Sequence, residues 1–126
     1  MMRAMQRTFL ALGALSGALA VAAGAFGAHG LRGKLSPDLM GVFETAARYH
    51  MYHALALIAV AAIATRLPGR GADAAGWLFV AGTVLFSGSL YLLALGGPRW
   101  LGAVTPLGGL CFIVGWAALA WSAVRG

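Results

Sequence analysis

The sequence predicts an all-α protein: a four-helix transmembrane bundle formed by a single domain that covers residues 1–126. Two observations carry this prediction. Hydrophobic residues make up 61% of the chain and charged residues only 10%, whereas soluble domains are roughly 45–50% apolar and about 25% charged. The apolar residues also fall into four runs of about 20 residues or more, the length an α-helix needs to cross a hydrocarbon core of about 30 Å.

The four spans are expected at residues 8–28, 44–65, 74–95 and 101–124. The second is preceded by Ser36-Pro37-Asp38, which is a strong helix start because serine caps the first turn and proline fits the first helical position. A helix that begins at Pro37 is longer than the hydrocarbon core is thick. The second span therefore carries a short interfacial extension, or it tilts.

Small residues recur along one face of the first and the fourth runs. Gly13 and Gly17 have the GxxxG spacing that lets two helix backbones approach closely, and Gly24 continues that face. Gly108 and Gly115 form a comparable face in the fourth run. We expect these five glycines to pack helices together. The first run also resembles a cleavable secretory signal, but a packing face favours a retained membrane helix.

The net charge of +6 comes from cations scattered singly at the ends of the apolar runs. This distribution favours membrane anchoring over nucleic-acid binding, which needs a basic patch or a recognisable module. The side that holds both termini carries a small excess of arginines, which predicts cytoplasmic termini. Those arginines are Arg3, Arg7, Arg66, Arg70 and Arg125. Cys111 is the single cysteine, so a cysteine redox pair is excluded.

Ionisable and aromatic side chains gather at the start of the second span, where residues 43–53 are Phe-Glu-Thr-Ala-Ala-Arg-Tyr-His-Met-Tyr-His. Ionisable groups are costly at membrane depth, so such a cluster is a candidate functional site. Glu44 and Arg48 are four residues apart with the acid first, the spacing that favours a local ion pair. We expect them to neutralise one another where the helix enters the lipid.

His50 and His53 are three residues apart and share a helix face. They could form a metal pair, a haem ligand set or a proton relay, or they could be hydrogen-bonded structural groups. A zinc site normally needs a third or fourth ligand, and His29 could supply it if the first helix ends beside the second. The sequence favours the structural interpretation, with His53 facing the bundle interior near His29 or Arg48, and it predicts no cofactor.

Two segments resemble a known family. Gly24–Leu31 and Phe43–Leu57 are similar to the hallmark segments of the YgdD/YwdK-like family, small bacterial inner-membrane proteins of unknown function. The resemblance implies a four-span membrane protein with no established activity. It is carried by six positions: His29, Glu44, Arg48, Tyr49, Tyr52 and His53. His50 departs from the pattern, because glutamine is common there, and this weakens a His50/His53 metal pair.

These observations favour a non-enzymatic protein of the bacterial inner membrane that interacts with a second copy of itself or with another membrane protein. Two alternatives stay open. One is an oligomeric transporter of protons or small ions that uses the His/Glu/Arg cluster. The other is a haem- or metal-binding redox protein, for which the sequence offers few further ligands.

Overall fold

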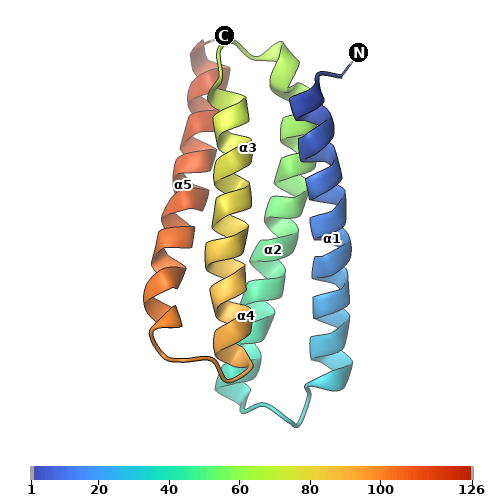
Figure 1. Cartoon of the computed structure of the whole chain (residues 1–126), viewed down its shortest axis with the longest axis vertical. Coiled ribbons are helices and arrows are strands. Elements are labelled where there is room, and N and C mark those ends of the chain that lie inside the picture. Colours follow the sequence, from blue (N-terminus) through green and yellow to red (C-terminus); the bar gives the residue numbers. More distant parts are fainter. Residues whose placement is uncertain (1, 126) are drawn as a thin grey trace.

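A computed structural model describes residues 2–125 and has four antiparallel helical rods, which confirms the predicted fold class (Figure 1). The first rod is α1 (Ala4–Gly30) and the second is α2 (Pro37–Ile63), which ends in a short 3₁₀ turn, η1 (Ala64–Arg66). The third rod is built from α3 (Gly71–Gly82), η2 (Thr83–Ser87) and α4 (Gly88–Ala94). The fourth is α5 (Leu101–Arg125). All four rods are long and apolar enough to cross a membrane.

The helix boundaries follow from local sequence chemistry. The Ser36 side chain accepts a hydrogen bond from the Leu39 backbone N–H at 3.2 Å, and Pro37 opens α2 as the sequence predicts. The helix then continues without a break to Ile63. Each of the three connections contains a glycine with positive φ, a backbone conformation that L side chains rarely adopt. These are Gly33, Gly69 and Gly96.

The central rod of the bundle is α2, which contacts both α1 and the third rod, while α5 packs mainly on the third rod. Both ends of the chain lie at the same end of the bundle, beside the connection between α2 and α3 (Figure 1). The main core cluster is formed by side chains from all four rods, among them Phe9, Leu57, Phe79 and Phe112. A smaller cluster of Leu31, Phe43 and Ala94 closes the opposite end.

The third rod contains one feature that the sequence analysis did not predict, a π-helical turn at η2. Its wide turn is marked by the Gly88 N–H, which donates to the carbonyl oxygen of Thr83 five residues earlier. The facing residue on α5 is Gly108, where an added Cβ would clash with the backbone nitrogen of Phe86. The glycine therefore makes room for the widened backbone.

Candidate functional site

The α2 residues of the predicted polar cluster lie on two different faces of that helix. His50 and His53 are buried, with 8% and 5% of their surfaces exposed. Glu44, Arg48 and Tyr52 are exposed on the other face. Their spacing of four residues places these three side chains in a line along the helix.

His53 is held by two hydrogen bonds that fix its tautomer. Its Nδ1 lies 2.8 Å from the carbonyl oxygen of Tyr49, so Nδ1 carries the proton and donates. Its Nε2 accepts from the Trp116 indole N–H at 3.1 Å. The ring also stacks on Phe112, with centroids 3.5 Å apart and planes 7° apart. The imidazole is therefore neutral, and both of its nitrogens have protein partners.

The two hydrogen bonds of His53 argue against a role for it as a metal ligand, a haem ligand or a proton relay. A metal ion or a haem iron would need the Nε2 lone pair, which is already engaged by the Trp116 N–H. A proton added at Nε2 would face another donor. His53 faces the bundle interior as predicted, but its neighbours are Tyr49, Trp116 and Phe112, and not His29 or Arg48.

His50 has a separate partner, although it is only three residues away. Its Nδ1 lies 2.9 Å from the Tyr91 hydroxyl on α4. Tyr91 in turn packs edge-to-face on Phe43, with ring centroids 5.1 Å apart. The two imidazoles thus bind different rods of the bundle. Within residues 2–125 no group of three or more His, Cys, Asp or Glu side chains is placed to hold a metal ion.

The predicted ion pair between Glu44 and Arg48 is wrong for the isolated chain. Across the described residues, 2–125, neither side chain forms an ion pair or a hydrogen bond, and the ion pair present joins Arg3 to Asp73. The spacing put both charges on one face, but both side chains extend outward from it. A common face is a condition for pairing and does not guarantee contact.

His29 and Tyr49 complete the predicted cluster, and they belong to different helices. His29 is exposed in the last turn of α1. Tyr49 is half-buried, and its ring lies 5.0 Å from that of Phe86 and 5.5 Å from that of Tyr52, measured between centroids. The structure therefore does not bring His29, Glu44, Arg48 and His53 together as a single relay.

The predicted packing glycines differ in what surrounds them. A Cβ at Gly13 would lie 2.9 Å from the carbonyl oxygen of Ala54, and one at Gly115 would lie 2.8 Å from the Phe79 ring. Gly17 is looser, since its nearest neighbour would be the Ala54 Cβ at 3.9 Å. Gly24 faces outward, and an added Cβ would meet nothing within 4 Å.

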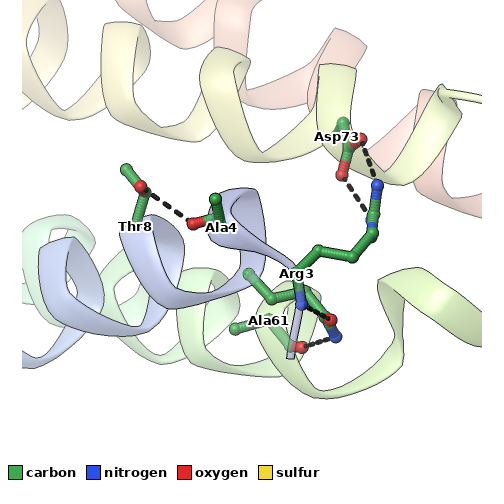
Figure 2. A network of polar contacts seen from close by, with 6 residues as sticks. Arg3, Ala4, Thr8, Ala61 and Asp73 are labelled. Carbon is green, nitrogen blue, oxygen red and sulfur yellow. Dashed lines mark hydrogen bonds and ion pairs between the residues drawn. The ribbon is translucent and has the colours of Figure 1, made fainter. Parts of the chain in front are cut away.

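A polar network at the terminal end of the bundle was missed by the sequence analysis. The Arg3 guanidinium donates to both carboxylate oxygens of Asp73, at 3.2 and 3.3 Å (Figure 2). Gln6 accepts from the Arg3 backbone N–H at 3.0 Å and donates to the Ala61 carbonyl oxygen at 2.6 Å. The signal for a capping interaction was the polar residue three positions after Arg3. Nothing in the sequence pointed to Asp73.

Comparison with known proteins identifies the family of this chain. Residues 23–109 match a family described as "Protein of unknown function (DUF423)". The chain is 51% identical over 120 residues to the UPF0382 membrane protein YwdK of Bacillus subtilis, covering 94% of this chain and 98% of that protein. The chain belongs to the DUF423/UPF0382 family of membrane proteins.

Other UPF0382 relatives agree over the same length. The chain is 48% identical to the UPF0382 membrane protein SERP0230 of Staphylococcus epidermidis over 94% of this chain and 97% of that protein. It is 50% identical to the UPF0382 membrane protein SH2409 of Staphylococcus haemolyticus, with the same coverage. No solved structure matches. The chain is thus a multi-pass membrane protein of a family with unknown function, as the resemblance implied.

Proposed function

We propose that the chain is a non-enzymatic protein of the bacterial inner membrane that self-associates through the outward face of α2. The observation that carries this proposal is the pair of opposite charges, Glu44 and Arg48, exposed one turn apart without a partner within residues 2–125. Tyr52 adds a half-exposed aromatic ring one turn further along. We call Glu44, Arg48 and Tyr52 the outward face of α2.

The position of these charges along the bundle makes their exposure costly. Glu44 follows Phe43, whose ring packs beside Gly27 in the last turns of α1. Arg48 lies one turn deeper, close to the middle of α2. Charged side chains in membrane spans almost always face a protein interior or pair with one another, because lipid offers no hydrogen-bond partners. A surface with two unpaired charges at this depth calls for a protein partner.

A second copy of the chain supplies the complementary charges. In a two-fold dimer with its axis along the membrane normal, the same face of both protomers meets itself. The side chain of Glu44 then lies one helical turn, about 6 Å at 1.5 Å per residue, from the level of the partner's Arg48. Both side chains are long enough to span that offset. Two equivalent ion pairs form across the axis, and Tyr52 packs beside its own copy.

Two further features support a role without catalysis. The hydrogen bonds of His53 occupy both of its nitrogens, so the most buried ionisable group has no free atom for proton transfer. Four of the other candidates, His29, Glu44, Arg48 and Tyr52, are exposed. We also propose that the termini are cytoplasmic, since the terminal side carries more arginines, and a reporter enzyme fused after Gly126 tests this orientation.

Energy transfer between fluorescently tagged full-length chains in liposomes tests the self-association. We expect concentration-dependent energy transfer for the natural sequence. Glu44→Leu or Arg48→Leu should weaken the association at least about tenfold, since each breaks a desolvated charge pair and leaves the other charge unpaired. Arg99→Leu, which removes an exposed arginine from the α4–α5 connection, is the matched control and should have no effect. Absence of energy transfer in the natural sequence, or a leucine variant that associates as tightly as the natural sequence, would overturn the proposal.

A further inference from the structure

The bundle has an apolar groove on the side of α2 opposite to its outward face. At the terminal end α1 touches α3, where the ring of Phe9 lies 5.1 Å from that of Trp77. Further along, a cavity of about 380 Å³ separates α1 from the third rod, with α2 as its floor. Leu12, Leu15, Ser16 and Leu19 form one wall, and Val80, Thr83 and Val84 form the other. The groove lies midway along all three rods, and therefore at the middle of the bilayer.

One ionisable group lines this groove. His50 is more than nine-tenths buried, yet it contributes to the groove wall. Its Nδ1 is bound to the Tyr91 hydroxyl. Its Nε2 has no partner within residues 2–125, and it is not among fully buried unsatisfied atoms, so it keeps accessible surface. His50 lines the groove, and we assign its accessible Nε2 as the atom that meets a ligand there.

The proton on His50 can be assigned from its partner. We assign the Tyr91 hydroxyl as the donor to Nδ1, because this gives its proton an acceptor and no other acceptor for it lies in the described part of the chain. A neutral imidazole that accepts at Nδ1 carries its proton on Nε2. The groove thus offers the His50 Nε2–H and the Ser16 hydroxyl as hydrogen-bond donors in an otherwise hydrocarbon-like surface. Its ligand must present an acceptor oxygen at the middle of the bilayer and be apolar elsewhere.

We propose that the groove binds a lipid-soluble carbonyl compound of the isoprenoid quinone class, with a ring carbonyl oxygen accepting from His50 Nε2. Phospholipids do not meet the requirement, because their ester oxygens lie in the interfacial region, outside the hydrocarbon core. A quinone has uncharged carbonyl oxygens on an apolar ring and an apolar tail. The volume of the groove is in the range of small-molecule sites, which are mostly apolar with a few placed polar groups.

The π-helical turn shapes this site. Thr83 and Val84 belong to η2 and also line the groove. The wider turn displaces the helix backbone at the point where the third rod faces α1, and π turns of this kind recur at functional sites. The Thr83 hydroxyl is turned back to the Phe79 carbonyl oxygen at 2.8 Å, so the donors left for a ligand are His50 and Ser16.

The test uses full-length protein in nanodiscs of defined phospholipid and a radiolabelled 1,4-naphthoquinone that carries two isoprene units. Empty nanodiscs give the background from partitioning. We expect saturable binding near one probe per chain. His50→Leu should weaken it about tenfold, the effect of one lost hydrogen bond. The hydrocarbon analogue that lacks both carbonyls should bind the two proteins alike.

A second variant keeps the test decisive if His50→Leu fails to fold. Val84→Phe fills the groove from an exposed position while His50 stays intact, and it should abolish saturable binding. Ile113→Phe makes the same kind of change at an exposed position of α5 outside the groove and should have no effect. No saturable binding, equal binding by His50→Leu, or displacement of the probe by diacylglycerol would each overturn the proposal. None of these variants touches the outward face of α2, so failure here leaves the proposed self-association standing.

Discussion

The two faces of α2 differ in whether their polar side chains have partners within residues 2–125. On the inward face the polar atoms of His53 are all engaged, by the Tyr49 carbonyl and by the Trp116 indole. On the outward face Glu44 and Arg48 have no partner within residues 2–125. Buried polar groups need hydrogen bonds wherever they lie, and the His53 site meets this need within one chain. The outward face is incomplete until something else covers it.

The largest expected effect is on the inward face. His53→Leu removes both hydrogen bonds and leaves the indole N–H of Trp116 without an acceptor, so it should destabilise the protein by about 3 kcal/mol. His53→Gln should cost less, because the amide also donates and accepts. Tyr52→Leu on the outward face is the comparison and should leave the monomer unchanged. Unfolding in mixed detergent micelles measures all three, and equal stability of His53→Leu and Tyr52→Leu would contradict the account.

A second test compares an inward and an outward glycine on α1. Gly13→Ala should destabilise by about 2 kcal/mol, because the added Cβ meets the Ala54 carbonyl oxygen at 2.9 Å and the backbones must separate. Gly24→Ala should be neutral or stabilising by up to about 1 kcal/mol, since alanine favours the helix and nothing lies within 4 Å. The same detergent unfolding assay checks both, and a Gly24→Ala cost as large as that of Gly13→Ala would show that the assignment of faces is wrong.

The outward charges give a smaller effect on the single chain. Glu44→Gln and Arg48→Gln should each change monomer stability by less than about 0.5 kcal/mol, because neither loses a contact within the chain. The double variant should be additive in detergent at protein concentrations where the chain is monomeric. Under dimer-forming conditions in lipid the two substitutions should instead be coupled. If the two substitutions are coupled in the detergent monomer, Glu44 and Arg48 form an ion pair within one chain, and the present account of this face is wrong.

The smallest effect is expected at the terminal network. Arg3→Gln breaks the bidentate contact with Asp73 (Figure 2), but the arginine side chain is 46% exposed, so the loss should stay below about 0.5 kcal/mol and fade with added salt. Arg7→Gln is the matched control from the next exposed arginine of α1. A salt-independent loss of several times this size would mean that the network holds α1 in place.

Much of the fold follows from local sequence, and the contacts between rods do not. Run lengths and the Ser36-Pro37 signal predict the helices, since these depend on a few neighbouring residues. The hydrogen bond from Trp116 to His53 joins residues 63 positions apart, and no local pattern specifies it. The π turn depends on the approach of Gly108 to Phe86, and this too becomes visible only when α5 is docked.

In the candidate site, too, local spacing predicts which residues share a helix face but not which residues they contact on other rods. Helical spacing predicted that Glu44 and Arg48 share a face, which they do, but it could not say whether that face meets protein or lipid. His50 and His53 looked like a pair by spacing, yet they bind Tyr91 and Trp116 on different rods. His29 comes from the first helix, and its distance from the others depends on how α1 is rotated against α2.

The most direct test of the central claim is a charge exchange on the outward face of α2. The Glu44→Arg variant and the Arg48→Glu variant each carry two like charges on this face, so each alone should give only background energy transfer in liposomes. Reconstituted together at equal amounts, the two variants present complementary faces and should restore energy transfer to the level of the natural sequence. Strong association of either variant alone, or a mixture that stays at background, would contradict the proposed dimer.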